Sequence, residues 1–194
     1  PQTSSRASRP RAHEMMPMAA LIYLLETLLS LGMLAVLLRL LLQWSRADFR
    51  NSLARAIVHL TNPVIVPLRR LLPAIGRIDT ASCVAVVIFA LLQVSVSWLL
   101  SGFGPPPAPI WLRLAVIEIL RTTLWTYFFA IFLYAMLSMV APGTYSPAQG
   151  LLVSLCEPIL RPFRRVIPPL AGLDLSPLWA GIVIQTLLIL LRSN

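Results

Sequence analysis

The chain has 194 residues, of which 58% are hydrophobic and 12% are charged, and its formal net charge is +9. This charged fraction is about half the ~25% of ordinary soluble domains, so it excludes a typical soluble protein and favours a membrane protein. Every basic residue is arginine, because the sequence contains no lysine. A strongly basic chain is able to contact nucleic acid, but the apolar content favours anionic lipid headgroups as the partner.

The first part of the chain combines a polar tail with a long apolar run. Residues 1–17 are polar and are expected to form a disordered N-terminal tail. Residues 19–44 are the first candidate membrane span, because they exceed the roughly 20 residues needed to cross a bilayer. Arg39 lies near the end of this run, and its side chain is expected to snorkel to the interface. Glu26 lies deeper and is the more costly charge.

The first connector, residues 45–78, is expected to begin with an amphipathic helix that lies in the membrane interface. Its apolar and basic residues recur at helical spacing. Pro63 is expected to end this helix, because proline is strongly disfavoured inside a helix. A proline-rich segment follows, and Asp79 after it is a candidate cap of the next helix.

Three further apolar runs are predicted to cross the membrane, at residues 80–100, 110–140 and 178–191. A proline-rich loop at residues 102–109 and a second connector at residues 141–173 separate them. The last run is short, so its helix must start near Asp174, with Ser176 as N-cap and Pro177 at the first helical position. The predicted fold is therefore an all-α integral membrane protein with four transmembrane helices.

A motif of prolines and arginines occurs once in each connector. Six of its residues recur in identical form 95 positions later, which indicates a tandem duplication. These are Pro63, Pro67, Arg69, Arg70, Pro73 and Asp79, which become Pro158, Pro162, Arg164, Arg165, Pro168 and Asp174. Each repeat is then a span, an amphipathic elbow and a second span, with repeat 1 at residues 18–101 and repeat 2 at residues 110–194. An even number of spans per repeat makes the two repeats parallel.

The orientation in the membrane follows from the distribution of arginine. The first connector holds six arginines and the second holds three, whereas the opposite side holds Arg113, Arg192 and those of the tail. The positive-inside rule therefore predicts that both connectors are cytoplasmic and that both termini are periplasmic.

The duplicated pattern P-x-x-x-P-x-R-R-x-x-P followed by aspartate, with an apolar span before each copy, resembles the YggT family of bacterial inner-membrane proteins. Relatives in cyanobacteria and plastids are called YlmG. Many members carry Asn-Pro before the motif, and the matching places here read Asn51-Ser52 and Ser146-Pro147. The resemblance covers nearly the whole chain. It implies a multi-pass protein of the bacterial inner membrane without known catalytic activity. It also implies links to osmotic-stress tolerance, to division-gene neighbourhoods and, in plastids, to nucleoid organisation and cytochrome assembly.

The arginine pairs Arg69-Arg70 and Arg164-Arg165 are the candidate binding residues. One interpretation is that they anchor the connectors to an anionic surface by charge. The other is a bidentate fork for a lipid phosphate or for a carboxylate of a partner, which suits arginine better than lysine. The two closing aspartates are expected to cap helices or to pair with these arginines within the chain.

Glu26 lies 95 positions before Arg121, so parallel repeats would place these opposite charges at similar depth. We therefore predict an intramembrane ion pair between the first and third spans. Glu118 is the competing local partner of Arg121, three residues away on the same helix face. An acidic group inside a span can also mark a path for protons or cations.

No metal site, cofactor or enzymatic activity is expected, because His13 and His59 are far apart and no catalytic motif occurs. Our first hypothesis is a scaffold, or an assembly or stress-tolerance factor, whose basic elbows hold anionic lipid, a protein partner or a second copy. The second is a small transporter or channel component linked to osmotic response, with Glu26 near the path. Nucleic acid is a weaker third partner, because no readout element is visible.

Overall fold

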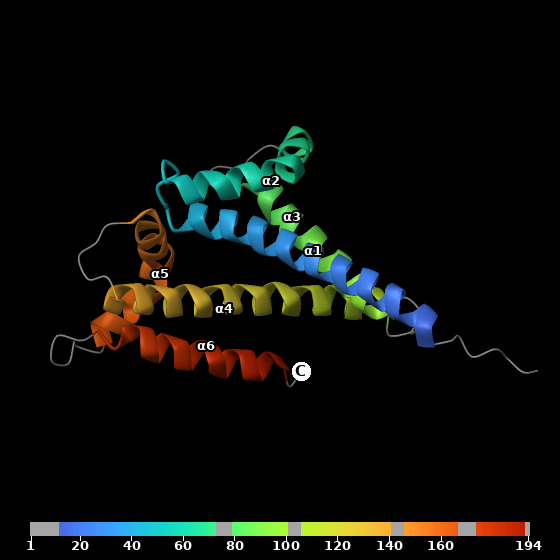
Figure 1. Cartoon of the computed structure of the whole chain (residues 1–194). Coiled ribbons are helices and arrows are strands. Elements are labelled where there is room, and N and C mark those ends of the chain that lie inside the picture. The colour runs from blue at the N-terminus through green and yellow to red at the C-terminus, as the bar shows by residue number, and fades with distance from the viewer. Residues whose placement is uncertain (1–11, 73–78, 101–105, 141–145, 167–173, 193–194) are drawn as a thin grey trace, which may run out of the picture.

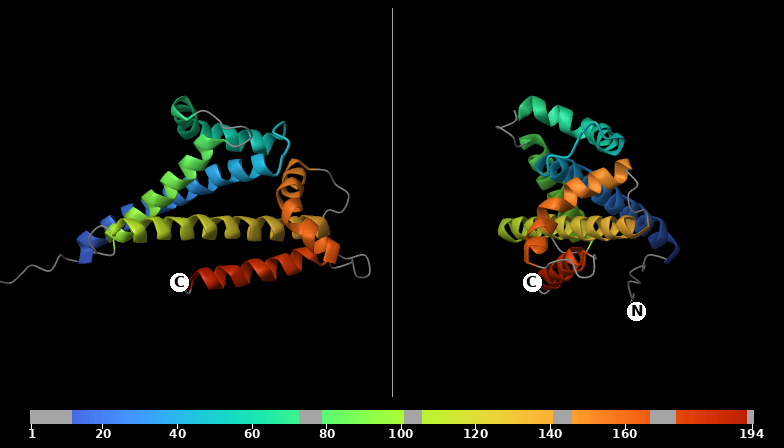
Figure 2. Two further views of the ribbon diagram at one scale, coloured as in Figure 1. Left: turned by 180° about the vertical axis from the view of Figure 1, so that it is seen from behind. Right: turned by 90° about the vertical axis from the view of Figure 1, so that its left-hand side faces the viewer.

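The computed structural model describes residues 12–72, 79–100, 106–140, 146–166 and 174–192, with side chains from residue 20 onward except that of Val140. This part of the chain is all-helical, which confirms the all-α part of the predicted fold class. Its six helices are α1 (Ala12–Trp44), α2 (Ser52–Leu71), α3 (Thr80–Leu100), α4 (Ala108–Val140), α5 (Pro147–Val166) and α6 (Ser176–Arg192). Figures 1 and 2 show that α5 and the start of α2 lie at the end of the molecule where α1 and α4 finish. The two connector helices therefore meet at the same end of the molecule.

In the described part of the chain, three helices are long and apolar enough to cross a membrane: Ala20–Trp44 of α1, the whole of α3, and Ala108–Met139 of α4. Helix α6 is apolar but has 17 residues. At 1.5 Å per residue it reaches about 25 Å, somewhat less than the ~30 Å of a bilayer core. The fourth predicted span therefore stays a prediction. Large apolar side chains such as Leu28, Leu31 and Phe132 are exposed on the long helices, where lipid tails would cover them.

The prolines of the motif lie inside the connector helices. Helix α2 continues through Pro63 and Pro67 to Leu71, and α5 continues through Pro158 and Pro162. The prediction that Pro63 ends the first connector helix is therefore wrong. A spacing of four places both prolines of a helix on one face, and all four rings are exposed. The helix can then bend while its freed carbonyls stay accessible, and Figure 1 shows α2 changing direction along its length.

The connector helices repeat with the spacing of the motif. Both have 20 residues, and both of their ends are 95 positions apart. The Asn51 side chain accepts a hydrogen bond from the Leu53 backbone N–H at 2.9 Å and donates one to the Pro147 carbonyl. This second bond ties the start of α2 to the start of α5. It also joins the asparagine retained in one repeat to the proline retained in the other. The last motif prolines, Pro73 and Pro168, lie outside the described residues.

Two helix starts differ from the expectations. Helix α1 begins at Ala12, inside the predicted tail, because extending an existing helix by a few residues is much easier than nucleating one. Residues 1–11 lie outside the described part. At α6, Ser176 is the first helical residue, and its buried hydroxyl has no partner among the described residues. Asp174 instead accepts a hydrogen bond from the Ser176 backbone N–H at 2.9 Å. The aspartate of the motif thus does the capping that was expected of the serine.

Close packing of α1 against α3 forms part of the core. Met33 and Val36 of α1 and Ala85 and Ala90 of α3 are buried. At Gly32 an added Cβ would lie 2.6 Å from Cε1 of Phe89 on α3. Glycine and alanine therefore allow the two helices to approach, as small residues do at helix interfaces in membranes.

The Gly32→Val variant is expected to lower the free energy of unfolding by about 1–3 kcal/mol, because the new side chain overpacks the contact with Phe89. The matched control is Gly181→Val in α6, where an added Cβ would meet no neighbouring atom closer than 4.0 Å. Thermal unfolding of both variants in one detergent tests this. Equal melting temperatures would contradict the tight packing at Gly32.

Candidate functional site

The first copy of the motif closes on a buried ion cluster, named here the Asp79 cluster. Arg69 at the end of α2 donates two hydrogen bonds to the Asp79 carboxylate, from Nε to Oδ1 at 3.2 Å and from Nη2 to Oδ2 at 2.6 Å. The Ser82 hydroxyl donates to Oδ2 at 2.7 Å. The Asp79 side chain is only 2% exposed. This bidentate, charge-assisted grip fixes the end of α2 to the start of α3.

Arg39 of α1 is the third charged member of the Asp79 cluster. Its Nη1 donates to Thr61 Oγ1 at 2.8 Å and to Asn62 Oδ1 at 3.0 Å, both on α2. Its Nε lies 3.9 Å from Asp79 Oδ2, and its side chain is 6% exposed. Helix α2 lies across the end of α1 and supplies these polar partners for the buried guanidinium. The expectation that Arg39 snorkels to the membrane interface stays a prediction.

The second copy of the motif forms a more open cluster, named here the Asp174 cluster. Arg164 donates from Nε to Asp174 Oδ2 at 2.8 Å and from Nη1 to Glu157 Oε2 at 2.7 Å. Its Nη2 donates to the Tyr134 hydroxyl of α4 at 3.0 Å. The Asp174 side chain is 41% exposed. Both closing aspartates thus pair with the first arginine of their motif.

The two clusters use equivalent positions but carry opposite net charge. Tyr134 stands 95 positions after Arg39, and Glu157 stands 95 positions after Asn62. The first cluster therefore surrounds one carboxylate with two guanidinium groups, for a net charge of +1. The second places one guanidinium between two carboxylates, for a net charge of −1. The sequence did not lead us to predict Arg39 as a member of this cluster. Its alignment with Tyr134, 95 positions later, is the pattern that could have pointed to it.

The second arginine of each motif pair lies outside these clusters. Arg70 and Arg165 are exposed in the last turns of α2 and α5, where positive charge also complements the helix dipole. The four arginines that were predicted as one binding set therefore divide into two kinds. Arg69 and Arg164 bind aspartates of the same chain, whereas Arg70 and Arg165 are exposed and form no ion pair with the described residues.

The Asp79 and Asp174 carboxyls make the fold sensitive to acid. Burial raises the pKa of Asp79, but hydrogen bonds from Arg69 and Ser82 and the nearby positive charges outweigh burial and hold the pKa below 3.8. Burial also raises the pKa of Asp174, but hydrogen bonds from Ser176 and Arg164 outweigh burial, and the pKa of Asp174 is again lowered. A depressed folded-state pKa stabilises the fold above the ordinary pKa, and this stability is lost as the pH falls through the depressed value.

The melting temperature is therefore expected to stay level down to about pH 5 and to fall steeply below about pH 4. Melting curves across this range, recorded in a non-ionic detergent, test the prediction. The Asp79→Asn variant should show a smaller acid-dependent loss than the unmodified chain, and an identical loss in both would contradict the assignment.

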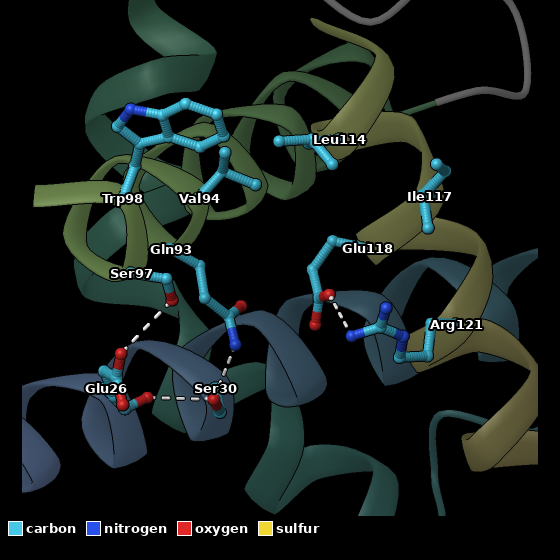
Figure 3. Close-up of a pocket in the computed structure, with 10 residues that line it drawn as sticks. All are labelled: Glu26, Ser30, Gln93, Val94, Ser97, Trp98, Leu114, Ile117, Glu118 and Arg121. Carbon is cyan, nitrogen blue, oxygen red and sulfur yellow. Dashed lines mark hydrogen bonds and ion pairs between the residues drawn. The ribbon is translucent and has the colours of Figure 1, made fainter. Parts of the chain in front are cut away.

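A polar cavity of about 380 Å³ lies between α1, α3 and α4 (Figure 3). Ser97 donates to Glu26 Oε1 at 3.2 Å, and Arg121 Nη1 donates to Glu118 Oε2 at 3.1 Å. The polar lining residues are Glu26, Ser30, Gln93, Ser97, Glu118 and Arg121. Two carboxylates against one guanidinium give this lining an excess negative charge. Such a lining suits water, a proton or a cation better than an anion.

The cavity brings together Glu26 and Arg121, the two residues of the predicted interhelical pair. Its ion pair, however, is the local one between Glu118 and Arg121. The Glu26–Arg121 pair stays a prediction, with a simple test. If that pair contributes, the Glu26→Gln variant will have a lower melting temperature in detergent than the unmodified chain.

Long apolar helices and two proline-bent connector helices, each closed by an arginine–aspartate cluster, define a helical protein of the membrane type. A family profile described as CCB3/YggT matches residues 18–100 and 114–194. The chain belongs to the CCB3/YggT family. One matched segment lies within each of the two sequence repeats.

Bacterial relatives span most of the chain. The uncharacterized protein PA0392 of Pseudomonas aeruginosa is 42% identical over 176 residues, which cover 90% of this chain and 89% of that protein. The uncharacterized protein YggT of Escherichia coli is 36% identical over 161 residues, which cover 83% of each chain. The uncharacterized protein in proC 3'region of Vibrio alginolyticus is 36% identical over 169 residues, which cover 87% and 91%. No solved structure matches the chain.

Proposed function

We propose that the protein is a non-enzymatic protein of the bacterial inner membrane that uses its connector helices to gather anionic lipid at the cytoplasmic surface. In this proposal all four apolar helices, α6 included, cross the membrane in two parallel repeats, and both termini are periplasmic. The protein then acts as a scaffold, or as an assembly or stress-tolerance factor, that organises a lipid patch for a protein partner or for further copies of itself.

The observation that carries this proposal is the separation of the two arginines in each motif. Arg70 and Arg165 are exposed, whereas their neighbours hold aspartates within the chain. Leu71 and Val166, which follow them, are 78% and 80% exposed. An exposed arginine beside an exposed apolar side chain suits a membrane surface. Each such arginine contributes about 1 kcal/mol near anionic lipid.

The test removes these two charges and counts bound lipid. The Arg70→Gln/Arg165→Gln protein is purified in mild detergent from mixed phosphatidylglycerol and phosphatidylcholine, and the retained lipids are quantified by mass spectrometry. The control, Arg113→Gln/Arg192→Gln, removes equal charge from helix ends away from the motif. Loss of phosphatidylglycerol enrichment only in the first variant supports the proposal. Equal enrichment in both variants and the unmodified chain contradicts it.

A second candidate function is a small ion transporter or channel component, and the polar cavity of Figure 3 favours it. Acidic side chains inside long apolar helices are costly in a bilayer, and such groups often mark a path for protons or ions. In this alternative Glu26 binds the proton or cation. Flux of protons, Na⁺ and K⁺ into vesicles that contain the purified chain tests it. Flux that Glu26→Gln abolishes would favour transport. The absence of flux in vesicles that contain the folded protein would contradict transport and leave the scaffold function in place.

A further inference from the structure

A second cavity, also about 380 Å³, lies where α2 crosses the end of α1. Its volume is within the range of about 300–1,000 Å³ that is common for ligand pockets. Its lining is strongly basic, with three arginines and a histidine and no carboxylate. The lining residues are Arg39, Gln43, Phe49, Arg55, Val58, His59 and Arg69. We call it the basic cavity.

The positive charge of the basic cavity is only partly neutralised within the described structure. Arg39 and Arg69 share one carboxylate, that of Asp79, which lies behind the lining. Arg55 adds a third positive charge without any acidic neighbour in the lining. Among these arginines Arg39 is buried, and an excess of positive charge around a buried guanidinium costs free energy that a bound anion would offset. The excess is about two charges, which matches a phosphate group.

The side chains of the basic cavity also have donors to spare. Within the described residues, the hydrogen bonds that Arg39 makes to α2 all use Nη1, and none of them uses Nη2. Arg55 and His59 are exposed side chains one helical turn apart on α2. Guanidinium and imidazole N–H groups on facing helices are a suitable donor set for phosphate oxygens.

The second repeat shows that this basic set is not a by-product of the fold. The positions equivalent to Arg39, Arg55 and His59 hold Tyr134, Gly150 and Ser154. The remaining arginine there is neutralised by two carboxylates. The same helical arrangement is therefore built without a basic cavity in repeat 2, so the fold does not require one in repeat 1.

We infer that the basic cavity binds one phosphate group per chain. The group belongs either to the headgroup of an anionic lipid or to a soluble phosphate compound, since both present the same oxygens. The inference deepens the proposed function and rests on it only for the position of α2 at the membrane surface. It adds a defined site in the first repeat to the general attraction of lipid by Arg70 and Arg165.

The experiment uses the full chain in a non-ionic detergent and has two arms. In the first, inorganic phosphate is titrated by calorimetry. In the second, the protein is equilibrated with phosphatidylglycerol or phosphatidylcholine, and native mass spectrometry counts the retained lipid. The test variant is Arg55→Gln/His59→Gln. These two side chains are exposed and make no side-chain hydrogen bond to the described residues, so their replacement should leave the fold intact. The control is Arg113→Gln, which removes the same formal charge at the start of α4.

Binding is expected in at least one of the two arms, and the double variant should weaken it about tenfold or more, as the loss of charged hydrogen bonds predicts. The control should bind like the unmodified chain. Phosphate binding without a retained phosphatidylglycerol would identify a soluble ligand, and binding in both arms would identify a phosphate site that also accepts a lipid headgroup. Retention of one phosphatidylglycerol without phosphate binding would identify a lipid headgroup.

The inference is overturned if the unmodified chain binds neither probe, or if the double variant binds as well as the unmodified chain. The Arg70→Gln/Arg165→Gln protein separates this failure from failure of the proposed function. That variant should lose general phosphatidylglycerol enrichment while it keeps the single site of the basic cavity.

Discussion

The Asp79→Asn variant is expected to lose about 3 kcal/mol of unfolding free energy, the largest effect of any single change considered for this protein. The carboxylate is 2% exposed and accepts both hydrogen bonds of the Arg69 fork. It is also the carboxylate that the buried Arg39 approaches. Asparagine keeps the shape but leaves two guanidinium groups close together without a counter-charge. Unfolding in detergent, followed by circular dichroism, measures the loss.

The Asp174→Asn variant is the matched control, at the equivalent position of the second repeat. Its side chain is 41% exposed, and Arg164 keeps Glu157 as a partner. The expected loss is therefore about 1 kcal/mol or less. A larger loss from Asp174→Asn than from Asp79→Asn would show that burial does not control the two clusters as described.

The Arg69→Gln variant is expected to lose about 2 kcal/mol of unfolding free energy, because the buried Asp79 carboxylate then lacks the guanidinium that donates two hydrogen bonds to it. The effect is smaller than that of Asp79→Asn, because the Arg69 side chain is 49% exposed and water screens part of its charge. Its control is the adjacent Arg70→Gln, which removes the same charge from an exposed side chain. That control should change stability by about 0.5 kcal/mol or less.

Equal destabilisation by Arg69→Gln and Arg70→Gln would contradict the conclusion that Arg69 stabilises the fold and Arg70 does not. The same comparison in the second repeat, Arg164→Gln against Arg165→Gln, provides an independent check. Arg164 holds two carboxylates and a tyrosine hydroxyl, so the order of the two effects should be the same.

Long-range register in the sequence predicted much of this architecture. The spacing of 95 positions predicted two equivalent connectors, and the helix bounds of α2 and α5 repeat with that spacing. The apolar runs predicted the first three spans, because length and hydropathy are local properties. Pairing of each closing aspartate with an arginine of its motif was one of two interpretations, and the structure adds which arginine is used.

The sequence does not predict what depends on tertiary packing. The partners of Arg39, Thr61 and Asn62, could not be predicted, because the sequence does not show that α2 folds across the end of α1. Pro63 was wrongly expected to stop a helix, because proline is strongly disfavoured in an isolated helix, whereas α2 is fixed at its far end by the Asp79 cluster. Both features depend on contacts between segments that are distant in the chain.

The central claim is that each motif pairs a structural arginine with a lipid-binding arginine. The most direct measurement compares Arg69→Gln/Arg164→Gln with Arg70→Gln/Arg165→Gln for both melting temperature and phosphatidylglycerol retention in one preparation. The account predicts opposite behaviour from two changes of equal charge. The first variant melts early but, below its melting temperature, still enriches the lipid through Arg70 and Arg165, apart from the single group that the basic cavity lined by Arg69 binds. The second melts normally but loses the general enrichment. Equal changes in both properties for the two variants would contradict it.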